Sequence, residues 1–174
     1  MTANGHQNRQ ELLKPASMRF VAFSLFAALM FNLLPWSGTG LLLRPDLLAL
    51  TLLFWSIREP LRMGIGIAWL LGLAIDIADG VLFGQNALAY ALAVFIALLL
   101  HRRIRMFTVW QQTFYIFLLL LLLQTMTLLI RLATGAPFIG AVYYASSLSG
   151  ALLWPPLTVL LQLPQRTEPN REPG

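Results

Sequence analysis

Two aspartates lie close together in a long apolar stretch, residues 63–85, which reads MGIGIAWLLGLAIDIADGVLFGQ. Asp76 and Asp79 are three residues apart, so on a helix both carboxylates would face the same side. Aspartic peptidases use two carboxylates that share a proton, but those groups face each other across a cleft. Asp46 could approach Asp76 from another segment, yet no peptidase-like motif surrounds either residue. We therefore predict no catalytic residues and interpret the acids as groups that pair or bind.

Metal and thiol chemistry find little support in the sequence. The chain has no cysteine, which excludes disulfides, thiolate metal sites and cysteine nucleophiles. His101 is the only histidine outside the N-terminal tail, and it lies in a basic segment far along the chain from the acids. A single histidine without companion ligands does not make a zinc site. We predict no metal site and no cofactor.

Small residues follow one another at helical spacing in the same apolar stretch. The series consists of Gly64, Ala68, Gly72 and Gly80, with Asp76 at the remaining position. On a helix these positions form a slanting ridge, and small residues on a membrane helix let a neighbouring backbone approach closely. The acid in the ridge needs a polar partner, because an unpaired charge in lipid is costly. The ridge is therefore a predicted helix-packing surface.

The composition indicates an integral membrane protein. The chain is 58% hydrophobic and 11% charged, whereas soluble domains carry about 25% charged residues. The apolar runs predict six transmembrane helices, at about residues 20–34, 41–57, 63–79, 85–100, 107–130 and 139–163. The fold class expected from this pattern is an all-α membrane protein with one six-span domain.

Polar segments separate and flank these runs. Residues 1–17 and 164–174 are predicted tails around a membrane domain at residues 18–163, and the basic segment 101–105 is a predicted loop. The second run starts with Arg44 and Pro45 in its first turn, where proline is tolerated. In the sixth run, Pro155 and Pro156 predict a kink or a break.

The basic residues predict the orientation of the chain in the membrane. Ten of the twelve Lys and Arg residues fall in the tails or in the segments after the second and fourth runs. They are Arg9, Lys14, Arg19, Arg58, Arg62, Arg102, Arg103, Arg105, Arg166 and Arg171. Arg44 and Arg131 fall on the other side. Because cytoplasmic segments carry an excess of Lys and Arg, we predict that both termini are cytoplasmic.

This orientation brings five charged residues to the outer end of the domain. They are Arg44 and Asp46 before the second helix, Asp76 and Asp79 at the end of the third, and Arg131 at the end of the fifth. Ionisable groups at membrane depth should pair, so we predict a network of these acids and arginines, including a pair between Asp76 and Arg131. The network could tie the helices together, or it could line a cavity or a partner-binding surface.

Several motifs, in order along the chain, carry a resemblance to a known family. They are LPW at 34–36, RPDLLALTLLFW at 44–55, Pro60 with Arg62, GLAIDIADGVLFGQNALAYA at 72–91, WQQ at 110–112 and SLSGALLWPP at 147–156. Over about residues 20–163 the sequence resembles the rod shape-determining membrane protein MreD family. Asp76 matches the family's aspartate position, whereas Asp46 falls where related sequences vary.

The resemblance implies a location, a function and partners. It implies a non-enzymatic protein of the bacterial inner membrane that works with MreC, a single-span protein with a periplasmic domain. Further implied partners are the MreB filament system, the RodA glycosyltransferase and its transpeptidase, which together position lateral peptidoglycan synthesis. The implied fold resembles the six-helix substrate-binding component of energy-coupling-factor transporters.

We therefore expect a membrane scaffold of the cell-elongation complex. The MreC helix is expected to dock near Gly64, Ala68 or Gly72, and the alternative is that the ridge packs against the chain's own helices. The alternative function is a transporter-like substrate-binding protein with the outer polar cluster as its site, and an intramembrane peptidase is a third. Membrane lipids are expected partners and nucleic acid is not, because the basic residues sit between apolar runs.

Overall fold

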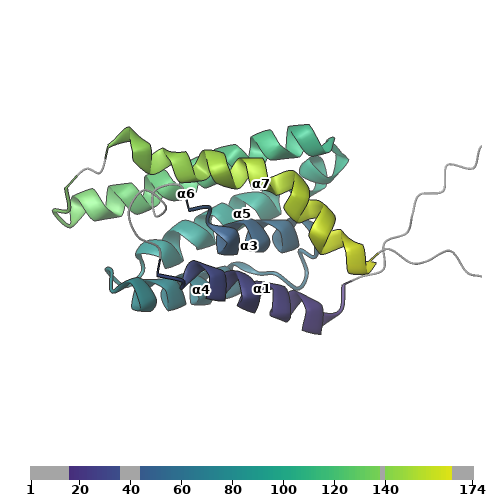
Figure 1. The fold of residues 1–174 in the computed structure, drawn as a ribbon, viewed down its shortest axis with the longest axis horizontal. Helices are drawn as coiled ribbons and strands as arrows, with labels where there is room; N and C mark the ends of the chain where they lie inside the picture. The colour runs from purple at the N-terminus through teal and green to yellow at the C-terminus, as the bar shows by residue number, and fades with distance from the viewer. Residues whose placement is uncertain (1–15, 36–43, 138–139, 166–174) are drawn as a thin grey trace, which may run out of the picture.

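The protein is a bundle of α-helices in a computed structural model that describes residues 16–35, 44–137 and 140–165 (Figure 1). All regular structure in these ranges is helical, which confirms the predicted all-α class. The elements are α1 (Met18–Asn32), α3 (Leu47–Arg58), α4 (Ile65–Asp79), α5 (Gln85–Met106), α6 (Val109–Ala133), η1 (Ala141–Tyr144), α7 (Ala145–Gln162) and η2 (Leu163–Gln165). Most of the two predicted tails lies outside the described residues.

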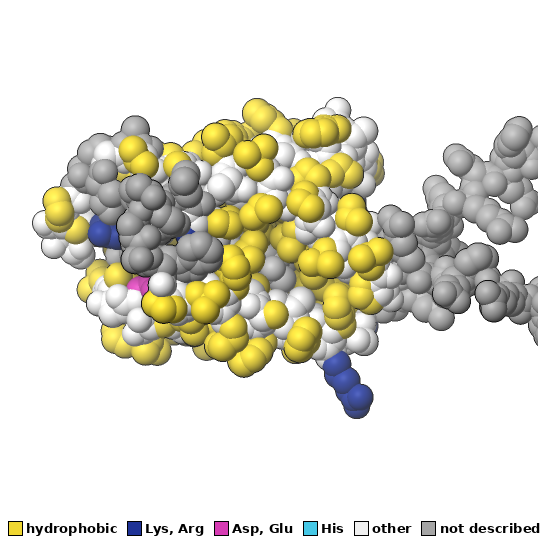
Figure 2. Space-filling model, viewed as in Figure 1, with side chains coloured by type: hydrophobic (Ala, Val, Ile, Leu, Met, Phe, Trp, Pro, Cys, Tyr) yellow, Lys and Arg dark blue, Asp and Glu magenta, His cyan; other side chains and the backbone are white. Residues whose placement is uncertain are grey.

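Within the described residues, three segments are long and apolar enough to cross a membrane. They are Gln85–Met106, Val109–Ala133 and Val142–Gln165. Helices α1 and α3 are apolar but shorter. Figure 2 shows hydrophobic side chains over most of the visible face, with charged side chains near its two ends. These features fit the predicted membrane protein, and the number of spans stays a prediction.

Two predicted helix boundaries are wrong. Residues 101–105 are not a loop but continue α5 to Met106, because they contain no proline or glycine and their basic side chains favour a helix C-terminus. The second helix begins at Leu47, after Arg44 and Pro45, because the Asp46 carboxylate accepts a hydrogen bond from the Ala49 N–H at 2.9 Å and caps it there. The predicted helix start at residue 41 lies outside the described ranges.

Helix α3 is the centre of the bundle. All of its residues from 48 to 57 are buried, and it packs against α1, α5, α6 and α7. The Trp55 ring makes an edge contact with Phe20 of α1 at 5.9 Å between centroids, and its indole N–H donates to Ser24 at 2.9 Å. Phe54 lies against Trp154 of α7 at 6.1 Å. Aromatic contacts therefore fix α1 and α7 on α3.

Helix α7 is continuous through Pro155 and Pro156. Figure 1 shows it changing direction in its second half, as expected for a helix that lacks two backbone N–H donors. The predicted kink is therefore present and the helix is not broken.

The helices run alternately in opposite directions along the bundle. The start of α1 and the end of α7 lie at the same end of the bundle (Figure 1). The ends of α4 and α6 therefore lie beside the starts of α3, α5 and α7 at the opposite end.

The small-residue ridge of α4 packs inside the bundle, against α5. A Cβ atom on Gly72 would lie 2.4 Å from the Cα of Ala87, so the two backbones are in direct contact. Ala68 and Asp76 are also buried. The expected docking of a partner helix at Ala68 or Gly72 does not hold, because these residues are covered within the bundle.

The two ends of the ridge have other roles. Gly64 is the N-cap of α4, and Gly80 ends that helix with a left-handed φ of 62°, which glycine adopts without strain. A Cβ atom at either position would meet nothing within 4 Å. Neither glycine is therefore a close-packing position within the bundle.

Gly72→Leu is expected to destabilise the protein, because the new side chain would collide with the α5 backbone. Overpacking typically costs about 1–3 kcal/mol, and a backbone neighbour cannot move aside as a flexible side chain can. Gly66→Leu is the matched control, since a Cβ atom at Gly66 of the same helix would meet nothing within 4 Å. Thermal unfolding midpoints in one detergent measure both changes. Equal midpoints for the two variants would contradict the close packing.

Candidate functional site

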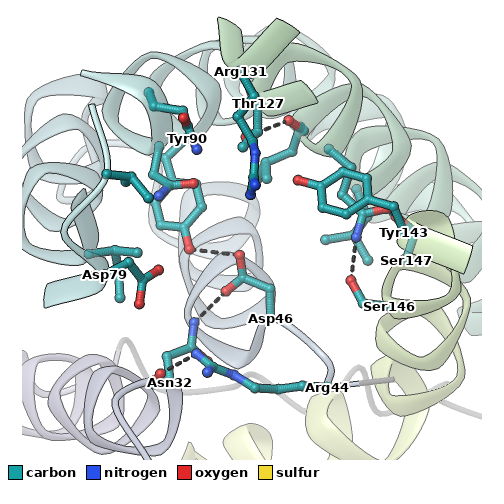
Figure 3. Close-up of a pocket in the computed structure, with 17 residues that line it drawn as sticks. Asn32, Arg44, Asp46, Asp79, Tyr90, Thr127, Arg131, Tyr143, Ser146 and Ser147 are labelled. Atoms are coloured by element: carbon teal, nitrogen blue, oxygen red, sulfur yellow. Dashed lines mark hydrogen bonds between the residues drawn. The ribbon is translucent and has the colours of Figure 1, made fainter. Parts of the chain in front are cut away.

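A polar pocket of about 440 Å³ lies among the helix ends opposite the start of α1 and the end of α7. Its walls come from the end of α1, the segment before α3, the end of α4, the start of α5, the end of α6 and the start of α7. Four of the five predicted charged residues line it, namely Arg44, Asp46, Asp79 and Arg131 (Figure 3). Asp76 does not line the pocket.

Asp46 joins three helices at the floor of the pocket. Besides capping α3, its carboxylate accepts a hydrogen bond from the Asn32 amide of α1 at 2.7 Å and from the Tyr90 hydroxyl of α5 at 2.6 Å. Hydrogen bonds to a charged group contribute about 1.5–3 kcal/mol each. Asp46 therefore fixes α1 and α5 at the start of α3, and its carboxylate is occupied.

Arg44 has a structural partner as well. Its guanidinium donates a hydrogen bond to the backbone carbonyl of Asn32, the last residue of α1. The last carbonyls of a helix lack partners within the helix and carry partial negative charge. The Arg44 side chain thus donates its hydrogen bond to the C-terminus of α1 and not to a carboxylate.

Asp76 binds the N-terminus of α5. Its side chain is 1% exposed, and its carboxylate accepts hydrogen bonds from the backbone N–H groups of Gly84 at 2.9 Å, Asn86 at 2.8 Å and Ala87 at 3.4 Å. Gly84 is the N-cap of α5 and has no side chain to offer, so Asp76 supplies the cap from across the turn. The positive end of the helix stabilises the buried charge.

The predicted pair between Asp76 and Arg131 is therefore not formed. Among residues 16–35, 44–137 and 140–165, the one ion pair within 4.0 Å joins Arg62 and Glu59 at 3.8 Å, away from the pocket. The predicted ion-pair network is wrong in form, because neutral amides, hydroxyls and backbone groups satisfy the charges of Asp46, Asp76 and Arg44. In the same described ranges the side chains of Arg131 and Asp79 have no hydrogen-bond or ion-pair partner.

The polar contact between α6 and α7 in the pocket wall was not predicted from the sequence. The Gln124 amide donates to the Ser146 hydroxyl and accepts from the Ser147 hydroxyl. Gln124 follows a run of six leucines, 118–123. An amide directly after this leucine run was the available signal, since polar residues in membrane helices hydrogen-bond across helix contacts.

Comparisons with known proteins identify the family of the chain. The family model described as rod shape-determining protein MreD matches residues 16–163. The chain belongs to the MreD family. Rod shape-determining protein MreD of Haemophilus influenzae is 26% identical over 144 residues, which cover 82% of this chain and 89% of that protein. The match to the MreD model takes in every helix that lines the pocket.

Family membership confirms the predicted family and supports a role in rod shape determination. No solved structure matches the chain significantly. The expected likeness between this MreD-family fold and the substrate-binding component of energy-coupling-factor transporters therefore stays a prediction.

Asp76→Asn is expected to lower the free energy of unfolding by about 1–3 kcal/mol, because an amide has one acceptor oxygen and no charge for three N–H groups. Asp79→Asn is the matched control, an acid three residues later on the same helix without a hydrogen-bond partner in the described ranges. It should change the free energy by no more than about 0.5 kcal/mol. Equilibrium unfolding in one detergent compares them, and a smaller loss for Asp76→Asn than for Asp79→Asn would count against the cap.

Proposed function

We propose that this chain is a non-enzymatic scaffold of the bacterial cell-elongation complex that helps to maintain rod shape. It acts by binding MreC and by positioning lateral peptidoglycan synthesis, with RodA, the elongation transpeptidase and the MreB system as further partners. The observation that carries the proposal is the match to the MreD model over residues 16–163, which takes in every helix from α1 to α7.

In this proposal the chain crosses the inner membrane several times with both termini in the cytoplasm. The charge distribution along the bundle supports this orientation. Arg58 ends α3, and Arg103 and Arg105 lie in the last turn of α5, at the end of the bundle where α1 begins and α7 ends. Cytoplasmic ends of membrane helices carry such an excess of basic residues. The polar pocket then faces the periplasmic side.

The partner helix needs an outward surface, since α4 uses its small-residue ridge internally. Exposed apolar side chains cover the outside of α4, with Leu70 62% and Ile77 64% exposed. Gly66 lies one turn before Leu70, and the space beside it is open. A glycine on an exposed apolar face allows a second helix to approach closely. We therefore place the MreC helix on this outer face of α4.

A cysteine-crosslinking scan tests the partner surface directly, because the chain has no cysteine of its own and each variant carries a single thiol. Exposed positions on five helices suit the scan: Phe26, Leu70, Leu99, Phe114 and Leu152. We expect crosslinks in native membranes to a cysteine in the MreC helix at Leu70→Cys, and not at the matched position Leu152→Cys on α7. A buried position, Leu50→Cys, controls for non-specific reaction. Crosslinks of equal yield at all exposed positions, or at none, would contradict the proposal.

A substrate-binding membrane protein is the second candidate function, and the polar pocket is the observation that favours it. Its volume of about 440 Å³ falls within the range of small-molecule sites, roughly 300–1,000 Å³. A scaffold does not require such a pocket. The chemistry of the unpaired groups in the pocket determines which kind of ligand it could bind.

A further inference from the structure

The polar groups that line the pocket fall into two sets. The first set, which includes Asp46, Arg44 and Gln124, is hydrogen-bonded within the protein. The second set has no side-chain hydrogen-bond partner in the part of the chain that the structure describes, and it consists of Asp79, Gln85, Asn86, Arg131 and Tyr143. Helix packing explains the first set and leaves the second unexplained.

Asn32 shows that the pocket wall holds a buried polar atom without a partner among the described residues. Asn32 is 4% exposed and its amide nitrogen donates to Asp46, but its Oδ1 atom is buried and has no hydrogen-bond partner among the described residues. Buried polar atoms are hydrogen-bonded in nearly all proteins, because leaving one unpaired costs about 1–3 kcal/mol. A hydrogen-bond donor on a ligand, such as an ammonium group, would supply the missing partner, since Asn32 lies in the pocket wall. The amide of Gln85, in the same wall, also makes no hydrogen bond to another described residue.

The charges of the second set specify that ligand. Figure 3 shows the Arg131 side chain reaching into the pocket between Tyr90 and Tyr143, with Asp79 on the other side of Tyr90. These opposite charges face one cavity but form no ion pair within 4.0 Å. A molecule with an anionic group for Arg131 and a cationic group for Asp79 would neutralise both.

The surroundings of the pocket indicate where the ligand comes from. Next to pocket-lining residues, the apolar side chains of Leu82, Phe83 and Val142 are 52%, 69% and 55% exposed. The pocket thus lies at the ends of apolar helices, at the level where lipid headgroups meet a membrane protein. Arginine binds phosphate through two parallel hydrogen bonds, which suits a phosphorylated headgroup.

We propose that the polar pocket binds an aminophosphate zwitterion, the chemistry of a phosphatidylethanolamine headgroup. The phosphate lies on the Arg131 guanidinium and accepts hydrogen bonds from Gln85 and Tyr143. The ammonium lies on the Asp79 carboxylate. This binding is independent of the MreC surface on α4, so either proposal can fail while the other holds.

Lipid binding by the purified full-length chain tests the proposal, by native mass spectrometry and by the shift of the unfolding midpoint. The probes are phosphatidylethanolamine, phosphatidylglycerol and phosphatidylcholine with identical acyl chains, and soluble phosphoethanolamine. We expect phosphatidylethanolamine to bind about tenfold more tightly than phosphatidylglycerol, which has the phosphate but no ammonium. Stabilisation by phosphoethanolamine in detergent alone would identify a free aminophosphate as the source, with the same contacts.

Three variants separate the two contacts. Arg131→Gln should weaken binding of every phosphate probe about tenfold or more, and Asp79→Asn should remove the preference for phosphatidylethanolamine while keeping binding of phosphatidylglycerol. Arg102→Gln, on an exposed arginine at the other end of α5, is the control and should change neither. If Arg131→Gln does not fold, the lipid preference of Asp79→Asn alone tests the proposal. Equal binding of the two lipids by the natural chain, or an unchanged preference in Asp79→Asn, would overturn the proposal.

Discussion

The pocket end of the bundle depends on the hydrogen bonds between the Asp76 carboxylate and the N-terminus of α5. A carboxylate that is 1% exposed in an apolar bundle needs compensation of its charge. Three backbone N–H groups supply it, and the helix holds them in place without loss of side-chain freedom. Four residues earlier on α4, Gly72 has no side chain, so the backbone of α5 lies in direct contact with it. The hydrogen bonds of Asp76 and the close backbone contact at Gly72 thus both hold α4 against α5.

This arrangement explains why the Arg131 side chain has no hydrogen-bond or ion-pair partner among the residues that the structure describes. Asp76 takes its donors from a helix end, and Asp46 takes them from Asn32, Tyr90 and Ala49. Neither acid therefore needs an arginine. Asp46 and Asp76 hold the helices together, whereas Asp79 and Arg131 face the cavity. The cavity residues can therefore bind a ligand without weakening the contacts between the helices.

The sequence predicted the helical class, the family and the gathering of charges at one end, because each follows from patterns that do not depend on side-chain partners. Apolar runs indicate membrane helices, and the basic residues between them indicate orientation. The partner of Asp76 could not be predicted in this way, since spacing shows which face an acid occupies but not whether an arginine or a helix N-terminus meets it. The helical course of residues 101–105 was missed for a related reason, because charge alone does not distinguish a loop from the polar end of a long helix. The contact of Gln124 with the α7 serines depends on the register of two helices, which no local pattern encodes.

The most direct test of this account is hydrogen–deuterium exchange at the backbone amides of Gly84, Asn86 and Ala87. In the natural chain these amides should exchange slowly, because the Asp76 carboxylate holds them. Asp76→Asn should speed their exchange, whereas Arg131→Gln should leave it unchanged. Fast exchange in the natural chain, or equal acceleration in Arg131→Gln, would contradict the claim that Asp76 closes the bundle and that Arg131 is free to bind a ligand.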